Sequence, residues 1–248
     1  MSRWRIDLEY DGRDFAGWQA QPNTRTVQGV LESAVEAVFQ VPARVHGAGR
    51  TDSGVSARQQ VACFNHAVER PARAVMHGLN RFLPDDVVVL AAREVPKAFH
   101  PRHSPHHKVY CYSWLVRTAR PVLARGRCWH SRADLDVAAM HEAVAPLQGT
   151  HDMSSFRATG CSSAHPVRTI LHASVTSRGP WVELRLVGTG FLRHQVRIVS
   201  GTLMDVGLGR RPIAHMAEVL AARDRSAAGR TAPAEGLMLE EIVYDDEP

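Results

Sequence analysis

The sequence predicts an α+β fold made of two similar α/β subdomains with mainly antiparallel sheets. Strand-like and helix-like apolar patterns occur in both halves of the 248 residues, and several strand patterns follow one another with no helix between them. A hydrophobic content of 44% is enough for one large core or two small ones. The polar, proline-containing segment 99–107 has neither periodicity, so we place the boundary there, between subdomains 1–104 and 105–248.

The first half begins with a strand and a helix. Residues 4–10 alternate apolar and charged side chains, which predicts a half-buried strand, and Asp11-Gly12 then forms a turn. Residues 27–38 have helical spacing, with Thr26 as the N-cap. The remaining expected elements are short strands at 45–48 and 61–64, a helix from Pro71 in its first turn to about Leu79, and a strand at 87–90.

The second half has a comparable order of elements without a clear sequence repeat. Alternating or compact apolar runs predict strands at 109–116, 170–176, 182–187 and 237–244. Helical spacing predicts helices at 137–147, beginning near Asp134 or Asp136, and at 192–206 and 213–220.

The chain is basic, and its positive charge is almost entirely arginine. The formal charge is +5, and among 30 basic residues only Lys97 and Lys108 are lysines. Arginine binds phosphate through two parallel N–H donors, so the composition indicates a polyanionic partner, most simply nucleic acid. A codon preference for arginine would explain the ratio of arginine to lysine, but not the net charge.

Several classes of protein find no support in the sequence. The four cysteines form no Cys-x-x-Cys pair, which argues against zinc ribbons and thioredoxin-like sites and fits reduced thiols in a cytosolic protein. We find no transmembrane-length apolar run and no signal peptide. The motifs of nucleotide hydrolases, dinucleotide-dependent enzymes and serine hydrolases are absent as well.

The segment Gly49-Arg50-Thr51-Asp52-Ser53-Gly54-Val55 is the strongest candidate for chemistry. An arginine beside Asp52 favours its ionised form, and a fixed carboxylate can act as a nucleophile or a general base. Two other interpretations are an ordinary surface turn and the Asp-Ser-Gly triplet of a dimeric aspartic protease. The protease needs two carboxylates that share a proton, which the arginine opposes, and its triplet follows an apolar strand.

Three further groups of residues could serve a function. Tyr110 and Tyr112 face one side of a strand, where one of them could stack on a base. Arg193 and Arg197 would share one helix face, and we expect Arg197 to point inward and to pair with Asp52. The histidines at 100, 103, 106 and 107 form a polar or phosphate-facing loop rather than a metal site, because prolines prevent a helix and no cysteine is near.

The Asp52 segment resembles the catalytic motif of the TruA family of tRNA pseudouridine synthases. Other segments in the same order along the chain resemble that family from end to end. These segments are Tyr10-Asp11-Gly12, Phe15-Ala16-Gly17-Trp18-Gln19, Thr26-Val27-Gln28-Gly29, Leu79-Asn80 with Leu83-Pro84, Phe99-His100-Pro101-Arg102, Tyr110-Cys111-Tyr112, His151-Asp152 with Ser155-Phe156-Arg157, Gly190-Phe191-Leu192 with Val196-Arg197, and Ala232-Pro233-Ala234 with Gly236-Leu237.

The resemblance implies a fold, a reaction and a set of site residues. The expected fold has two ferredoxin-like halves that form a central cleft, and the reaction converts uridine to pseudouridine at tRNA positions 38, 39 and 40. Asp52 would be the catalytic carboxylate, and Arg50, Tyr110 and Arg197 would bind the substrate. Residues expected to contact tRNA are Phe99, His100, Pro101, Arg102, His103, Arg157, Ala158, Thr159, Gly160 and Cys161.

The resemblance also implies a cytoplasmic homodimer that uses neither a metal nor an organic cofactor. The chain departs from the family pattern at four positions, namely Ser56, His103, Gln195 and Ile198. These departures concern the positioning of the substrate rather than the class of reaction. A basic RNA-binding protein without catalysis, such as a tRNA chaperone, is the main alternative hypothesis.

Overall fold

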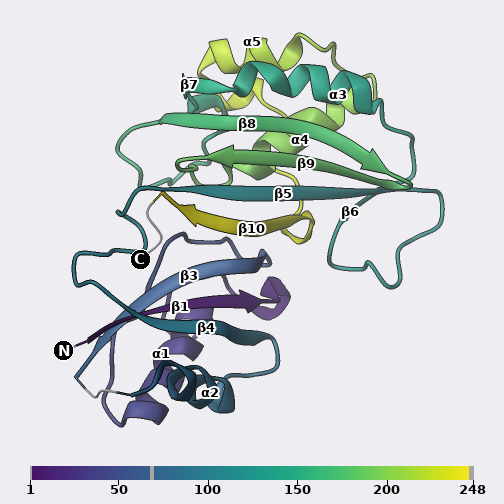
Figure 1. The fold of residues 1–248 in the computed structure, drawn as a ribbon. Helices are drawn as coiled ribbons and strands as arrows, with labels where there is room; N and C mark the ends of the chain where they lie inside the picture. Colours follow the sequence, from purple (N-terminus) through teal and green to yellow (C-terminus); the bar gives the residue numbers. More distant parts are fainter. Residues whose placement is uncertain (1, 68–69, 246–248) are drawn as a thin grey trace. The chain divides into compact units, whose positions relative to one another are not determined.

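A computed structural model describes residues 2–67 and 70–245, and the chain divides into two compact units (Figure 1). Unit 1 comprises Met1–His106 with Leu239–Pro248, and unit 2 comprises His107–Met238. The sequence placed all of residues 105–248 in one subdomain. In the structure most of the last strand, from Leu239 onward, instead belongs to unit 1.

Unit 1 is a sheet with two helices. Its strands lie in the order β4 (Val87–Val95), β1 (Ser2–Tyr10), β3 (Ser56–His66) and β10 (Leu237–Tyr244), with β2 (His46–Gly47) also paired to β3. The β1–β3, β1–β4 and β2–β3 pairs are antiparallel, as the sequence predicted for this class of fold. The helices are α1 (Val27–Phe39) and α2 (Ala72–Phe82), and both lie on one side of β1, β3 and β4 in Figure 1.

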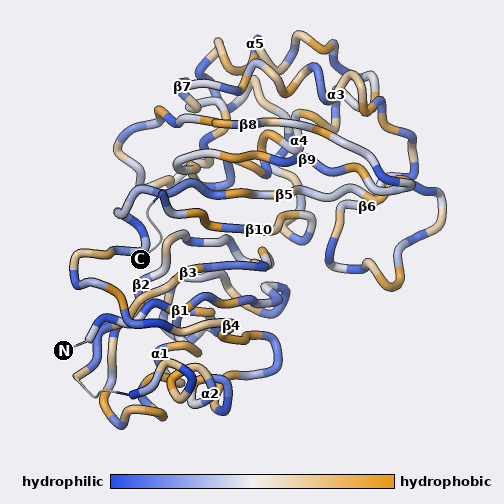
Figure 2. The backbone as a smooth tube through the Cα atoms, in the orientation of Figure 1, coloured by the Kyte–Doolittle hydropathy of each residue, from blue (hydrophilic) through white to orange (hydrophobic). Residues whose placement is uncertain are grey.

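The core of unit 1 follows from the alternation along β1, which Figure 2 shows as changes between hydrophilic and hydrophobic colour. Trp4, Ile6 and Leu8 are buried on the face that the helices cover. Trp4 is opposite Phe64 on β3, whose ring centre lies 5.7 Å from that of Phe39 in α1. Burial of these large side chains holds the helices on the sheet.

The opposite face of β1 carries a buried ion pair. Arg5 is only 1% exposed, and its Nε donates to the Asp7 carboxylate at 2.8 Å. The Arg5 guanidinium also lies 4.9 Å from the ring centre of Tyr244 and 5.7 Å from that of Phe99. A buried cation requires such partners, so this contact ties the segment around Phe99 and strand β10 to the sheet.

Unit 2 contains a further set of strands and three helices. Its strands lie in the order β5 (His106–Val116), β9 (Trp181–Gly188), β8 (Val167–Arg178) and β7 (Gly149–Asp152), and β6 (Trp129–Ser131) pairs in parallel with β5. The other pairs are antiparallel. The helices α3 (Val137–Val144), α4 (Gln195–Gly207) and α5 (His215–Ala222) pack together on one side of these strands (Figure 1).

Most of the predicted elements are present, and the predicted α+β class is confirmed. Thr26 and Asp136 cap α1 and α3 as expected, each accepting a hydrogen bond from a backbone N–H in the first turn. Pro71 precedes α2 instead of lying in its first turn. His106 and His107 belong to β5 and not to the predicted linker, and β6 and β7 were not predicted.

Among the described residues no helix combines the length and apolar character that crossing a membrane requires.

We expect the Arg5 ion pair to be a major contribution to the stability of unit 1. Arg5→Ala removes a buried cation and leaves the Asp7 carboxylate, 12% exposed, without its closest partner, and should lower the free energy of unfolding by about 3–5 kcal/mol. Arg58→Ala is the matched control, because Arg58 is 67% exposed in its pair with Glu240 and such pairs contribute about 1 kcal/mol or less. Denaturant unfolding measures both variants, and equal losses would contradict the assigned importance of burial.

Candidate active site

Asp52 begins a tight turn between β2 and β3. The N–H of Val55 donates to the Asp52 carbonyl at 3.1 Å, and Gly54 has a φ of 80°, a conformation that favours glycine. The Asp52 side chain is half-buried, while that of Arg50 is exposed. The turn therefore presents a carboxylate and an arginine that lie two residues apart in the sequence.

The backbone of residues 15–18 holds both sides of the Asp52 turn. The N–H of Trp18 donates to the Thr51 carbonyl at 3.1 Å, and the N–H of Gly54 donates to the Phe15 carbonyl at 3.3 Å. Gly17 lies between these bonds with a φ of 102°, and a Cβ there would come within 2.9 Å of the Thr51 carbonyl oxygen. Only glycine allows this close approach, so the sequence Phe15-Ala16-Gly17-Trp18 is part of the site.

A buried hydrogen-bond chain anchors the segment just before Asp52. The hydroxyl groups of Tyr10 and Thr51 lie 2.8 Å apart, and the Gln60 amide donates to the Gly49 carbonyl at 3.0 Å. Burial raises the pKa of Tyr10 to about 12, so its hydroxyl stays protonated at neutral pH and remains part of this chain. The sequence analysis did not identify Tyr10 or Gln60 as supporting residues, because their hydrogen bonds to Thr51 and Gly49 join residues 41 and 11 apart and no local pattern reveals them.

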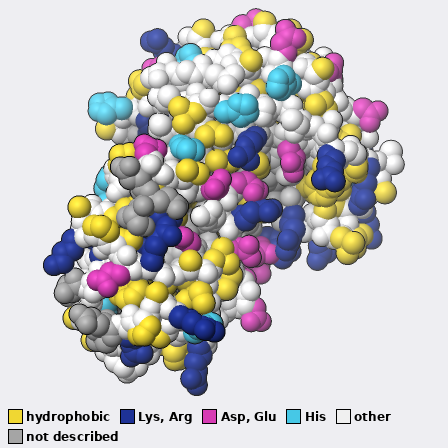
Figure 3. All heavy atoms as spheres, in the orientation of Figure 1, with side chains coloured by type: hydrophobic (Ala, Val, Ile, Leu, Met, Phe, Trp, Pro, Cys, Tyr) yellow, Lys and Arg dark blue, Asp and Glu magenta, His cyan; other side chains and the backbone are white. Residues whose placement is uncertain are grey.

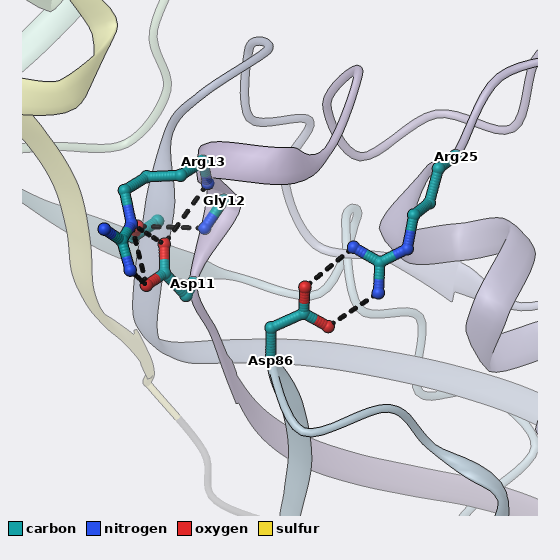
Figure 4. A network of polar contacts seen from close by, with 6 residues as sticks. Asp11, Gly12, Arg13, Arg25 and Asp86 are labelled. Atoms are coloured by element: carbon teal, nitrogen blue, oxygen red, sulfur yellow. Dashed lines mark hydrogen bonds and ion pairs between the residues drawn. The ribbon is translucent and has the colours of Figure 1, made fainter. Parts of the chain in front are cut away.

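A second layer of ion pairs fixes residues 11–17 (Figure 4). The Arg25 guanidinium donates two hydrogen bonds to the Asp86 carboxylate, at 2.7 and 2.8 Å, and lies 4.1 Å from the ring centre of Phe15. Arg13 pairs with Asp11 at 2.6 Å. At Gly12, whose N–H donates to the Ser56 hydroxyl at 3.0 Å, a Cβ would overlap the Val55 carbonyl.

The expected tRNA-contacting residues 99–103 also belong to unit 1. Phe99 and Pro101 are buried, whereas Arg102 and His103 are exposed. Pro101 is held by the Tyr244 hydroxyl, which donates to its carbonyl at 2.6 Å. The segment thus presents its polar side chains from a fixed backbone.

In unit 2, Tyr110 lies on β5 and contacts Phe191, which belongs to a segment that also resembles the family. Tyr110 is 7% exposed, and its ring meets the ring of Phe191 edge-on, with centres 5.0 Å apart. Tyr112 is fully buried, and its hydroxyl donates to the Pro233 carbonyl at 3.0 Å. Of the two tyrosines that the sequence offered, Tyr112 is therefore a core residue and Tyr110 remains the candidate.

Arg197 lies in the first turn of α4. Its Nε donates to the Ala232 carbonyl at 2.9 Å, and the Ala232 N–H donates to the Arg197 carbonyl at 3.0 Å. Burial raises the pKa of Tyr112, although the nearby charge of Arg197 opposes this shift. The segment that contains Ala232 and Pro233, near the end of the chain in sequence, therefore positions both side chains.

The predicted helical pair of Arg193 and Arg197 is wrong. The helix begins only at Gln195, because His194 has a left-handed φ of 60°. Arg193 instead contacts the expected tRNA-contacting loop 157–161, where its guanidinium donates to the Gly160 carbonyl at 3.5 Å.

Arg157 closes the loop 157–161 by donating to the carbonyls of Cys161 and Ser163. Burial alone would raise the pKa of the Cys161 thiol, but backbone hydrogen bonds at Ser163 and Arg193 and the Arg157 guanidinium together lower it. These contacts therefore favour the thiolate form of Cys161.

The candidate residues thus fall into two sets. Asp52, Arg50 and residues 99–103 belong to unit 1, and Tyr110, Arg197 and residues 157–161 belong to unit 2. Within the described residues, no group of three or more His, Cys, Asp or Glu side chains is arranged to hold a metal ion.

Unit 2 also has a basic surface loop between β5 and β6. Figure 3 shows Lys and Arg side chains gathered beside hydrophobic atoms in this region. The loop exposes two apolar side chains, with Leu123 97% and Val122 66% exposed. Its exposed arginines are Arg117, Arg120, Arg125 and Arg127.

Comparisons with known proteins find similar sequences over the full length of the chain. The sequence pattern of a family described as tRNA pseudouridine synthase matches residues 8–104 and 143–245. The tRNA pseudouridine synthase A of Myxococcus xanthus is 46% identical over 249 residues, which cover 100% of this chain and 94% of that protein. The protein of the same name from Acidiphilium cryptum is 46% identical over 252 residues, covering 100% and 98%.

A more distant relative of the same name, from Geobacter sp. (strain M21), is 41% identical over 247 residues, covering 99% of this chain and all of that protein. A solved chain in a Cbf5–Nop10–Gar1 complex is 11% identical and has a TM-score of 0.33, which is too low to indicate a shared fold. The identity over the full chain and the matched family pattern lead to one conclusion: this chain belongs to the tRNA pseudouridine synthase family.

Proposed function

We propose that this chain converts uridine to pseudouridine at positions 38, 39 and 40 of the tRNA anticodon stem-loop, with Asp52 as the catalytic carboxylate. The observation that carries the proposal is the Asp52 turn, whose backbone is held on both sides by residues 15–18 and whose aspartate side chain is half-buried. A carboxylate in a fixed position is suited to act on one bond of a bound nucleotide. Family membership favours neither the non-catalytic RNA-binding protein nor the aspartic protease.

The proposed reaction is an isomerisation. The bond from ribose C1′ to N1 of uracil breaks, the base turns, and a bond from C1′ to C5 forms. The C5 proton is then lost to solvent while N1 gains one, so no electrons or groups are exchanged with a cofactor. The Asp52 carboxylate could attack the sugar or the base, or remove a sugar proton, and each role requires its ionised form.

Three further residues have proposed roles in binding the target nucleotide. A uridine in a stem is stacked and paired, so the enzyme must extrude it. We assign to Arg50, which is exposed, the displacement of the base, and to Tyr110 the packing against the extruded uracil. Arg197, whose Nε is fixed by the Ala232 carbonyl, would pair with Asp52 and keep the carboxylate ionised.

Contacts to the tRNA backbone would come from the segments 99–103 and 157–161 and from the arginine-rich loop between β5 and β6. Exposed arginines such as Arg102 and Arg120 can bind phosphates without reading sequence. The exposed Leu123 beside them offers an apolar contact to a sugar or base. We also propose, from the family resemblance, that the chain acts as a cytoplasmic homodimer without a metal or organic cofactor.

The decisive test is tritium release from tRNA that carries 5-tritiated uridine. Wild-type protein should release tritium, because the new bond at C5 expels that hydrogen, and Asp52→Asn should abolish release while it still binds tRNA. Asp85→Asn, at an exposed aspartate of unit 1, is the control and should keep full activity. No release by wild type despite tight tRNA binding would contradict the proposed reaction, and release by Asp52→Asn would contradict the role of that carboxylate.

Arg50→Lys should reduce tritium release by about tenfold or more, since lysine keeps the charge but lacks the planar group that can fill the space of a displaced base. The affinity for tRNA, measured by filter binding, should change little. Arg58→Lys, an exposed arginine on the following strand β3, serves as the control. Wild-type turnover by Arg50→Lys would show that Arg50 contributes only charge.

A further inference from the structure

Three imidazole rings form a cluster in unit 1, with the rings tilted relative to one another. The ring centres of His100 and His103 lie 4.4 Å apart, and those of His100 and His46 lie 6.0 Å apart. His46 lies on the short strand β2, far from the other two in sequence, and was not among the site residues expected from the sequence. His46 and His103 are exposed, whereas His100 is half-buried between them.

A tight turn fixes the His100 ring, which lies near both of the other rings in this cluster. The N–H groups of His103 and Ser104 donate to the His100 carbonyl at 3.1 and 2.9 Å, which brings His103 back over His100. The Nδ1 atom of His100 accepts a hydrogen bond from the Arg102 N–H at 3.1 Å. This bond places the proton of the neutral His100 ring on Nε2, which is then a donor without a positive charge on the ring.

The groups that face His100 are all basic. Burial lowers the pKa of His100, and His103, Arg3, His46 and Arg102 lower it further. Arg3 comes from β1 and His46 from β2, while Arg102 and His103 come from the turn itself. A cluster of bases around one donor is a site where an anion would relieve mutual repulsion.

We propose that His46, His100 and His103, together with Arg102, form a proton-linked binding site for a phosphate of the RNA backbone. The proposal rests on the proposed function, since the RNA is the tRNA substrate. His100 would donate from Nε2, and the exposed rings of His46 and His103 would take up protons when the phosphate binds. A bound phosphate stabilises the protonated form of an imidazole, so the complex holds more protons than the free protein.

The sign of the pH effect follows from this proton uptake. Because the bound state holds more protons, tRNA binding strengthens as pH falls and weakens as pH rises through the range in which imidazole titrates. Filter binding of tRNA to the inert Asp52→Asn protein, at constant ionic strength, should give an affinity at about pH 6 that is at least about threefold higher than at about pH 8.

Substitutions distinguish the contribution of this site to the pH dependence of tRNA binding from that of the other histidines. His46→Gln and His103→Gln should each reduce the pH dependence, and the double substitution should remove most of it. His77→Gln, an exposed histidine on α2, is the control and should leave the dependence as in Asp52→Asn alone. An unchanged pH dependence in the double variant would overturn the proposal. Tritium release by wild type decides the proposed function separately, because it does not depend on the outcome of these binding measurements.

Discussion

The position of Asp52 depends on a close approach between two backbone segments, residues 12–18 and 51–56. At Gly12 and Gly17 any side chain would collide with the carbonyls of Val55 and Thr51, and the hydrogen bonds between the segments require that distance. The backbone on both sides of Asp52 is therefore held by a segment far from it in sequence. Such a support limits the motion of the turn and is the form of preorganisation that catalysis by a single carboxylate needs.

The loop that holds the Asp52 turn is itself held by the hydrophobic core of unit 1. The N–H groups of Val27 and Gln28, at the start of α1, donate to the carbonyls of Gly17 and Trp18. Val27 is fully buried, and Trp18 is 2% exposed, so the loop lies between the helix and the turn. Packing of α1 on the sheet thus fixes the loop, and the loop fixes the turn, which joins the stability of the core to the geometry of the site.

The sequence predicted those features whose causes are local. The helix capped by Thr26 and the strand that ends at Tyr244 follow from short-range patterns, and the Asp52 motif is contiguous. It did not predict the three-residue strand β6, which is too short to show a period, or the late start of α4 at the left-handed His194. The hydrogen bond between Tyr10 and Thr51 joins residues 41 apart, and no local pattern reveals such a contact.

Of the four departures that the resemblance implied, three have physical explanations in the structure, and the fourth, His103, bears on how this chain responds to pH. The Ser56 hydroxyl accepts a hydrogen bond from the Gly12 N–H, the Gln195 side chain accepts one from the Leu192 N–H, and Ile198 is fully buried, so three of the four support the backbone or the core. His103 alone adds a titratable group. Because all but two of the 30 basic residues are arginines, whose charge does not change near neutral pH, a response of RNA binding to pH in this range must come mainly from the histidines.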